Sequence, residues 1–358
     1  MWFIPQKKST SEAPKTPEEI KIGAILPLTG KVAVFGEWIK NGMEMALECA
    51  RKEKNGNMVV IYEDSRMDAK TGVLALNKLL TVDKVDIVVS AMSKVSIPLI
   101  PIVEKKQMPL ILLDVTYPQI TQKGKMLFRH FIQSDREASI LAKHAITYLK
   151  IKRAGVLYVN DEAGLGAKEA FLRVFSKLGG EISQVENFDF TATDMKSQIS
   201  KIMSAQVDAI YLFGNGPSWA VCLKQIRELG YSGKILTNTA MYIPNFRKLA
   251  GDSAIEGVYF TYPYMDLKYK SVQRFVERYH KRYGFYPPIE SAYAWDIIHW
   301  IAKAQSLKGK SIYEKLLSVK ELSSAFGEIQ IPEDRDIKTK VGIGVVKDGN
   351  ITTLSVQE

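Results

Sequence analysis

The sequence predicts an α/β fold made of two doubly wound lobes, each built on a parallel sheet. The chain has 358 residues, which is enough for two domains of ordinary size. Short apolar stretches alternate with segments of helical spacing, the order that produces a parallel sheet covered by helices on both faces. That order starts at Ile20, runs to Asp135, and begins again at Arg136.

The first block contains four apolar strands separated by helices. The strands are expected at Ile20–Leu26, Met58–Tyr62, Ile87–Val89 and Pro109–Leu113. The helices are expected at Glu37–Lys52, Ala69–Leu80 and Ser96–Lys106. Gly42 and Ala46 lie about one turn apart in the first helix, so another element can pack closely against it.

The second block repeats this pattern. Its helices are expected at Glu137–Leu149, Gly166–Leu178, Met195–Ala205 and Ser218–Leu229, and its strands at Arg153–Val159, Glu181–Asn187, Ala209–Phe213 and Lys234–Thr237. Two long helices follow, Lys270–Tyr283 and Ser291–Leu307. The chain then closes with a β-hairpin, because Gly342–Val346 and Ile351–Val356 flank a turn whose Asp-Gly-Asn sequence favours positive φ.

Composition argues against several classes of function. The formal net charge is +10, but the Lys and Arg residues are spread along the whole chain, whereas nucleic-acid-binding proteins concentrate them in a patch. We therefore expect no nucleic-acid partner. No stretch approaches the ~20 apolar residues of a membrane helix. The four histidines show no ligand spacing near a cysteine, so we expect no metal and no other cofactor.

The two cysteines, Cys49 and Cys222, both lie in helical patterns. We interpret them as small buried hydrophobic side chains, and a long-range disulfide is the alternative. The N-terminal segment also has two interpretations. Met1–Pro5 is apolar and Gln6–Glu19 has a composition with little reason to fold. The segment is either the remnant of a signal or anchor followed by a tether, or a frayed tail.

No catalytic motif is convincing. The sequence lacks a P-loop, a dinucleotide-binding glycine motif after a strand, and a nucleophile elbow. Asp64 and Asp68 could pair as acid and base. Asp64, however, ends a strand, and Asp68 is placed to cap the next helix. We therefore expect a protein that is not an enzyme, and a doubly wound enzyme using Asp64, Asp68 and Ser93 is the alternative.

The stretch Asp86–Thr121 instead carries binding chemistry. Ser93 follows a buried strand where a helix-like segment begins, and Thr116 follows the next strand. The carboxyl ends of neighbouring parallel strands meet at one edge of the sheet, where open α/β folds bind ligands. A helix N-terminus there offers unpaired N–H groups to an anion. The two residues together predict a carboxylate site, although each alone is more typical of a helix cap or a strand end.

Aromatic residues also gather at strand ends and turns. Together they could line an apolar pocket for a ligand side chain, whereas singly each is typical of a core. These residues are Phe35, Trp219, Tyr242, Tyr293 and Trp295.

From Ile20 onward the sequence resembles the periplasmic leucine/isoleucine/valine-binding protein family, the type I solute-binding proteins of ABC transporters. The segment IKIGAILPLTGKVAVFGEWIKNGMEMALE is similar to the family's first strand, P-L-[ST]-G turn and first helix. Further similarity lies in YEDSRMDAKTGVLALNKLL, Asp86–Thr121, RAGVLYVNDEAGLGAKEAF, VDAIYLFGNGPSWAVCLKQIRELG and YPPIESAYAWDIIHWIAKA. The order and spacing of these segments carry the resemblance, rather than any single motif.

The resemblance implies the type I periplasmic-binding-protein fold. In that fold, two doubly wound parallel-sheet lobes are joined by a three-strand hinge, and hinge closure traps the ligand between them. Lobe 1 would contain residues 20–135 and 262–331, and lobe 2 would contain residues 136–261 and 332–358. Residues 1–19 would be the N-terminal tether or the signal or anchor remnant.

The resemblance also implies a set of ligand-binding residues. The family's carboxylate-binding serine falls on Ser93, and the threonine that contacts both the carboxylate and the α-ammonium falls on Thr116. A ligand-binding backbone carbonyl falls on Asp114, and the pocket aromatic before a glycine falls on Phe35. The family's late-helix tyrosine falls on Trp295, with Tyr293 as an alternative.

The second lobe departs from the family pattern. A family tyrosine falls on Ala163, and an aromatic falls on Asn215. The acid that pairs with the ligand's α-ammonium falls on Thr239, which carries no charge. A buried ammonium without a carboxylate is costly. Either Asp114 replaces the acid, or the acid lies within a residue or two of Thr239, or the ligand is a carboxylate without an amine.

The function implied by the resemblance is an extracytoplasmic solute-binding protein. It would capture a small carboxylate, either a branched-chain or other amino acid or a related organic acid, between its lobes for an ABC importer. Its partners would be that ligand and an ABC permease, and it would act as a monomer. It would be periplasmic or extracellular, free or anchored through its N-terminus. A ligand-sensing receptor or regulatory domain of the same fold is the alternative.

Overall fold

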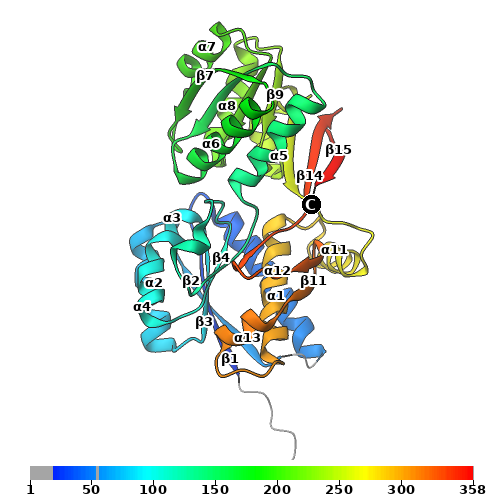
Figure 1. The fold of residues 1–358 in the computed structure, drawn as a ribbon. Helices are drawn as coiled ribbons and strands as arrows, with labels where there is room; N and C mark the ends of the chain where they lie inside the picture. Colours follow the sequence, from blue (N-terminus) through cyan, green and yellow to red (C-terminus); the bar gives the residue numbers. More distant parts are fainter. Residues whose placement is uncertain (1–18, 54–55, 358) are drawn as a thin grey trace, which may run out of the picture.

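The computed structural model describes residues 19–53 and 56–357, which form two lobes stacked along the long axis of the molecule (Figure 1). The predicted N-terminal tether lies outside the described residues apart from Glu19. Both lobes are α/β with largely parallel sheets, which confirms the predicted fold class.

Lobe 1 is built on a six-stranded parallel sheet with the order β13-β5-β4-β3-β1-β2. Its strands are β1 (Ile20–Leu26), β2 (Met58–Asp64), β3 (Ile87–Ala91), β4 (Leu110–Leu113), β5 (Leu127–His130) and β13 (Asp336–Ile337). Side chains alternate between the two faces of this sheet. In β1, Ile22, Ala24 and Leu26 enter one hydrophobic core, and Ile25 enters the other.

Helices cover both faces of this sheet (Figure 1). One face carries α1 (Ala33–Lys52), α11 (Lys270–Tyr283), α12 (Ile289–Gln305) and α13 (Ile312–Ser318), whose apolar side chains share one core with the sheet. The other face carries α2 (Ala69–Lys78), α3 (Ser93–Ser96) and α4 (Ile100–Lys106). A small hairpin, β11 (Glu321–Ser324) and β12 (Gly327–Gln330), packs beside α12.

Lobe 2 is built on a seven-stranded sheet with the order β15-β14-β10-β9-β8-β6-β7. The parallel strands are β6 (Arg153–Val159), β7 (Glu181–Phe188), β8 (Ala209–Phe213), β9 (Lys234–Thr237) and β10 (Tyr259–Pro263). The antiparallel hairpin β14 (Val341–Lys347) and β15 (Asn350–Gln357) extends its edge. The helices are α5 (Ser134–Thr147), α6 (Glu162–Lys177), α7 (Lys196–Ser204), α8 (Gly216–Glu228), α9 (Pro244–Ala250) and α10 (Asp252–Ile255).

The chain passes between the lobes three times, after β5, after β10 and after β13. Sheet membership thus gives residues 20–133 and 264–338 to lobe 1 and the remaining described residues to lobe 2. The expected third boundary, after Ile331, precedes β13, which pairs with β5 in the lobe 1 sheet. Lobe 1 therefore extends a few residues further than expected.

Most predicted elements are present with nearly the predicted bounds, and the differences have local causes. Strand β5 was not predicted, because its buried Arg129 and His130 interrupt the apolar pattern. Helix α6 begins at Glu162 instead of Gly166, since Asp161 caps it by accepting a hydrogen bond from the N–H of Gly164 at 2.8 Å. The C-terminal hairpin is confirmed, and its turn has the expected positive φ at Asp348 and Gly349.

Both cysteines are buried and form no disulfide, as the first interpretation expected. Within the described part of the chain, no group of three or more side chains is placed to hold a metal ion. None of the helices in residues 19–53 and 56–357 is both long enough and apolar enough to cross a membrane.

Gly42 is where α1 and α12 approach each other most closely. A Cβ atom at this position would lie 2.2 Å from the carbonyl oxygen of Ser291, a backbone atom that cannot turn away. We expect Gly42→Ala to lower the free energy of unfolding by about 1–3 kcal/mol, because the clash outweighs the helix-propensity gain of about 1 kcal/mol. Urea unfolding measures the change.

Gly72→Ala in α2 is the matched control for this substitution. Its Cβ would meet only the Val95 side chain, at 2.7 Å, so we expect a smaller loss. A more stable Gly42→Ala protein would contradict the close approach of the two helices.

Candidate functional site

The two hydroxyl residues predicted to bind a carboxylate lie at neighbouring strand ends of lobe 1. Strands β3 and β4 pair in register up to Ala91 and Leu113, so Ser93 and Thr116 follow them at the same edge of the sheet. Ser93 is half-buried and Thr116 is buried. Neither hydroxyl makes a hydrogen bond with any described residue. Both remain available to a ligand.

Backbone N–H groups at this edge are also unpaired. The N–H groups of Val95 and Ser96 bond to the carbonyl of Met92, but those of Ser93, Lys94 and Thr116 have no acceptor among the described residues. Helical geometry continues from Ser93 through Ile97–Leu99 into α4. The helix start therefore presents free donors and the positive end of its dipole, which suits an anion.

Two residues at this edge adopt left-handed backbone conformations although neither is glycine. Met92, after β3, has φ of 72°, and Asp114, after β4, has φ of 52°. Such conformations cost roughly 1–2 kcal/mol each and cluster at functional sites. They turn the chain sharply after each strand, just before Ser93 and Thr116 respectively.

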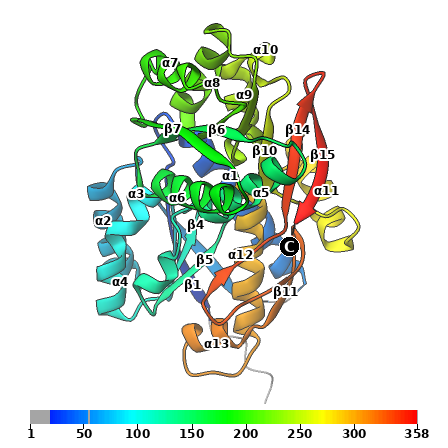
Figure 2. The same ribbon diagram turned by 45° about the horizontal axis from the view of Figure 1, so that its top comes forward.

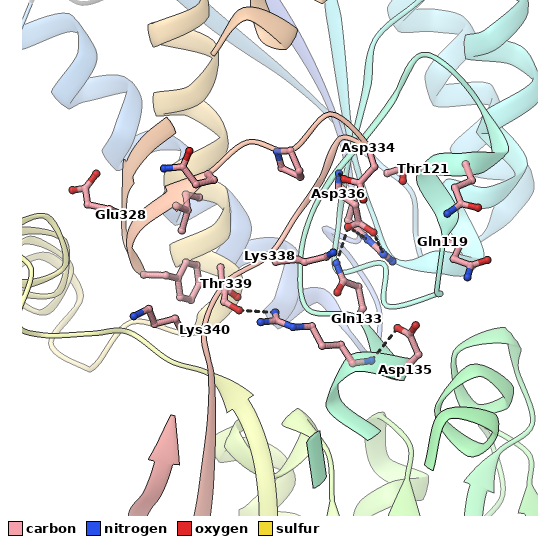
Figure 3. A pocket seen from close by; sticks show the side chains of 17 residues that line it. Gln119, Thr121, Gln133, Asp135, Glu328, Asp334, Asp336, Lys338, Thr339 and Lys340 are labelled. Carbon is pink, nitrogen blue, oxygen red and sulfur yellow. Dashed lines mark hydrogen bonds and ion pairs between the residues drawn. The ribbon is translucent and has the colours of Figure 1, made fainter. Parts of the chain in front are cut away.

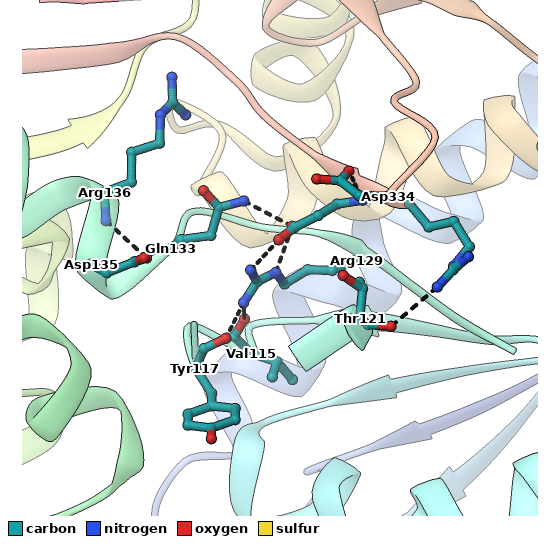
Figure 4. Close-up of polar contacts among 10 residues, drawn as sticks. Val115, Tyr117, Thr121, Arg129, Gln133, Asp135, Arg136 and Asp334 are labelled. Atoms are coloured by element: carbon teal, nitrogen blue, oxygen red, sulfur yellow. Dashed lines mark hydrogen bonds and ion pairs between the residues drawn. The ribbon is translucent and has the colours of Figure 1, made fainter. Parts of the chain in front are cut away.

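Buried Arg129 fixes the backbone around Thr116 (Figure 4). Its guanidinium donates through Nη1 to the carbonyls of Val115, at 3.2 Å, and Tyr117, so both carbonyls that flank Thr116 are held by one group. Its Nε donates to Oδ1 of Asp336 at 2.8 Å, and its Nη2 donates to Oδ2 at 2.5 Å. Arg129 is fully buried. We assign it a positioning role for the Thr116 N–H.

The same network reaches the hinge. The N–H of Ser134, the first residue of α5, donates to the carbonyl of Thr116 at 3.0 Å. The side-chain amide of Gln133 donates to Oδ1 of Asp336 at 2.8 Å. The first and third crossings are therefore tied to the strand end that carries Thr116, and we expect movement at the hinge to be transmitted to it.

The lobes are in contact on both sides of this edge. The ring of Phe35, in α1, lies 5.8 Å from that of Phe246 in α9 of lobe 2. A Cβ on Gly166, in α6, would come within 2.5 Å of Pro118 in the loop after β4. Figure 2 shows α6 above the end of β4, where the lobes meet. Phe35 thus takes part in the interface between the lobes.

The three predicted lobe 2 residues all lie where a strand gives way to a helix. Ala163 is the second residue of α6, half-buried Asn215 is the N-cap of α8, and Thr239 begins a 3₁₀ segment after β9. The side chain of Asn215 makes no hydrogen bond within the described residues. None of the three carries a charge, so this set by itself supplies no partner for a cation.

A carboxyl group nevertheless lies beside Thr239, supplied by Glu137 in the first turn of α5. Its Oε1 accepts hydrogen bonds from the N–H of Thr239 at 2.9 Å, from the Thr239 hydroxyl, and from the Thr261 hydroxyl at 2.9 Å. Burial raises the pKa of Glu137 to about 7, although these hydrogen bonds oppose the rise. The group joins α5 to the ends of β9 and β10.

The predicted late-helix aromatics pack into the lobe 1 core. Trp295 is buried against Phe275 and His299, with ring centroids at 5.4 and 4.3 Å, and among the described residues its ring packs on no other predicted site aromatic. Tyr293 is fully buried and its hydroxyl lies 3.0 Å from Oγ1 of Thr339 in the third crossing. We therefore leave Trp295 out of the proposed site and place Tyr293 at the hinge.

Two acids near the lobe 1 edge, Asp114 and Glu290, were not predicted from the sequence to act together. Asp114 was predicted only through its carbonyl, and Glu290, in the first turn of α12, was not predicted at all. Glu290 is 2% exposed, and its Oε2 has no hydrogen-bond partner within the described chain. The signal was present, because Glu290 and Asp296 are the only acids in the largely apolar segment Ile289–Ala302.

A cavity of about 710 Å³ opens at the hinge (Figure 3). It is lined by residues of the first crossing, the third crossing and the β11–β12 hairpin, including Gln133, Arg136, Lys338 and Phe326. None of the predicted ligand-binding residues lines it. We place the ligand site at the strand ends instead, because the unpaired hydroxyl and N–H groups lie there.

The two aspartates considered for catalysis have structural roles. Asp64 accepts hydrogen bonds from the N–H groups of Leu28, Thr29 and Arg66, and from the Thr29 hydroxyl at 2.5 Å. Burial raises its pKa, but these hydrogen bonds lower it further, to below the ordinary value. Asp68 caps α2 by accepting from the N–H of Thr71 at 2.8 Å.

Known proteins are similar to this chain in sequence. The sequence matches the family model described as periplasmic binding protein over residues 19–350. It is 28% identical to a Leu/Ile/Val-binding protein, BraC3, of Rhizobium johnstonii, over 71% of this chain and 70% of that protein. It is also 28% identical to the leucine-, isoleucine-, valine-, threonine-, and alanine-binding protein of Pseudomonas aeruginosa, over 69% of this chain and 67% of that protein.

Solved structures share the fold. A leucine-binding protein from Thermotoga maritima has a TM-score of 0.85 and 27% identity, covering 94% of this chain and 98% of that one. An ABC-transporter solute-binding protein from Rhodopseudomonas palustris, in complex with 3,4-dihydroxybenzoic acid, has a TM-score of 0.83 and 23% identity, covering 95% of this chain and 97% of that one.

Proposed function

Because this chain belongs to the periplasmic binding protein family, whose members bind solutes and are not enzymes, we propose that it captures a small carboxylate between its two lobes for an ABC importer. The observation that carries this proposal is the set of unpaired donors at the ends of β3 and β4. The hydroxyls and N–H groups of Ser93 and Thr116 have no acceptor among the residues that the structure describes.

Carboxylate chemistry is also what the relatives' ligands have in common. Curated relatives are named for leucine, isoleucine, valine, threonine and alanine, and a structural neighbour holds 3,4-dihydroxybenzoic acid. All of these carry a carboxylate, whereas only some carry an amine. The proposed partner is a permease of an ABC transporter, and the proposed place of action is outside the cytoplasmic membrane.

The first test is a thermal-shift screen of amino acids, keto acids and aromatic acids. A ligand present at about 100 times its dissociation constant stabilises the folded protein by about 2.7 kcal/mol. We expect at least one carboxylate to do so. If no carboxylate in the panel raises the unfolding temperature, the proposed function is wrong.

Ser93→Ala is expected to weaken binding of that carboxylate about 10–100-fold, because a hydrogen bond to a charged group contributes about 1.5–3 kcal/mol. Isothermal titration calorimetry measures the loss. Ser96→Ala is the matched control, since Ser96 lies on the same helical run and its Oγ is paired with that of Ser90 at 2.8 Å. The control is expected to bind like the wild type. Equal binding by both variants would contradict the placement of the site.

A further inference from the structure

The ligand-binding edge of lobe 1 holds two carboxyl groups without a cationic partner, those of Asp114 and Glu290. This inference rests on the proposed function, because it concerns the second polar group of the same ligand. Other buried acids of the described chain have side-chain partners. Asp336, for example, is bound by Arg129, and Asp296 lies 2.9 Å from Nε2 of His130.

Glu290 is buried inside lobe 1 rather than exposed to solvent. It lies in the first turn of α12, which packs against β4. Its helix neighbours Tyr293 and Ala294, three and four residues on, share its face and are fully buried. Its Oε2 is buried without a hydrogen-bond partner. A buried carboxyl oxygen without a hydrogen-bond partner lowers the stability of the folded protein by about 1–3 kcal/mol.

Asp114, which follows β4, is the acid whose charge acts on Glu290. Its left-handed backbone places it between β4 and Thr116, and its half-buried side chain makes no hydrogen bond or ion pair with any described residue. The two carboxyls interact electrostatically. Both therefore lie at the strand edge that also carries the free donors of Thr116.

No other group neutralises this pair. The titratable groups that face Glu290 are Asp114, from the end of β4, and the phenol of Tyr279, from α11. No lysine, arginine or histidine within the described residues interacts electrostatically with Glu290. Burial raises the pKa of Asp114 to about 7, and burial together with Asp114 raises that of Glu290 to about 8. Two carboxyls in this situation share a proton near neutral pH.

Lobe 2 offers one acid near its predicted site residues. Ala163, Asn215 and Thr239 are uncharged at the positions described above. The Glu137 carboxyl beside Thr239 is 1% exposed, and its Oε1 already accepts three hydrogen bonds, whereas its Oε2 accepts none from the described residues. At the lobe 1 edge, the carboxyl groups of the described chain that make no contact with another polar side chain are those of Asp114 and Glu290.

We propose that Asp114 and Glu290 form a subsite for a cationic amine, so that the ligand carries an amine as well as a carboxylate and lobe 1 binds both charges. Ser93 and Thr116 hold the carboxylate, and the acid pair holds the ammonium in place of an acid at the position of Thr239. The proton shared by the pair leaves to solvent as the ammonium enters. Lobe 2 then closes over a ligand whose charges are already paired.

The test compares ligands that differ only in the amine, by calorimetry on the whole chain. The probes are L-leucine with 4-methylpentanoate and L-phenylalanine with 3-phenylpropanoate. In the wild type we expect the amine-bearing member of at least one pair to bind about tenfold or more tightly. We expect Glu290→Gln and Asp114→Asn each to reduce that preference about tenfold or more. Glu137→Gln, a matched neutralisation of a buried acid, should leave the preference unchanged.

Proton release gives a second readout. Titrations near pH 7 in buffers of different ionisation enthalpy should show release of about one proton on binding of the amine-bearing ligand, and a smaller release with Glu290→Gln, in which only Asp114 can lose a proton. Unchanged binding of the deamino ligand shows that a variant is folded.

The outcomes separate the two proposals. If no probe or other carboxylate binds the wild type, the proposed function fails. If carboxylates bind without preference for the amine, or if the preference survives Glu290→Gln and Asp114→Asn, only the amine subsite fails. Loss of the preference in Glu137→Gln alone would assign the ammonium to lobe 2 and overturn the inference.

Discussion

Asp336→Ala is expected to lower the free energy of unfolding by about 3–5 kcal/mol, the typical cost of removing one partner from a buried ion pair. Arg129 is fully buried, and Asp336 accepts from both its Nε and its Nη2. The substitution leaves the guanidinium charge in the interior with only backbone carbonyls as partners. It also removes the acceptor of Gln133. Urea unfolding followed by circular dichroism measures the loss.

Glu48→Ala is the control for this prediction. Glu48 pairs with Arg282 at 2.7 Å, but the two side chains are 45% and 40% exposed. An exposed pair contributes about 0–1 kcal/mol, so the control should unfold almost like the wild type. Similar losses in both variants would show that Arg129 is hydrated or otherwise compensated when Asp336 is absent.

Asp336→Ala should also weaken ligand binding. Arg129 holds the carbonyls on both sides of Thr116, and the variant frees it to move. We therefore expect a weaker carboxylate affinity at a temperature where the variant is still folded. Unchanged affinity would restrict Arg129 to a structural role.

Glu137→Gln is expected to change how stability depends on pH. The ordinary pKa of a glutamate is about 4.5, and burial raises that of Glu137 to about 7. Between these values the folded protein holds a proton that the unfolded chain has released. The stabilising contribution is therefore complete below the unfolded pKa and is lost as the pH rises through the folded pKa. The loss amounts to about 3 kcal/mol by about pH 8.

Glutamine keeps the Oε1 acceptor used by Thr239 and Thr261 but cannot ionise. We expect the stability advantage of the wild type over Glu137→Gln to fall by about 3 kcal/mol between about pH 4 and about pH 8. Chemical unfolding at several pH values measures the difference, and the other buried acids cancel because both proteins contain them. Glu169→Gln changes a side chain that is 67% exposed, so its free energy of unfolding should depend on pH as that of the wild type does. If the free energy of unfolding of Glu137→Gln depends on pH as that of the wild type does, Glu137 does not hold a proton in the folded protein.

Local sequence patterns were sufficient for most of the fold. The strands β1, β6, β8 and β9 have the predicted bounds, because a run of apolar residues between turn residues records burial on both faces of a sheet. Strand β5 could not be found in this way. Its Arg129 and His130 are buried only because Asp336 and Asp296 meet them from positions 207 and 166 residues away. Neither partner is visible in a local pattern.

The proposed site also has one part that local sequence predicted and another part that it did not. The sequence by itself was sufficient to bring Ser93 and Thr116, the proposed carboxylate half, to one place, because each closely follows a strand and the edge they share is a property of any parallel sheet. Only the tertiary structure decided where the acids lie. It placed Glu137 beside Thr239, 102 residues apart, and Glu290 beside Asp114 through the packing of α12 on β4. The physical reason is that the charge state and partners of a buried acid depend on which distant elements exclude water from it, and no neighbour in the chain records that.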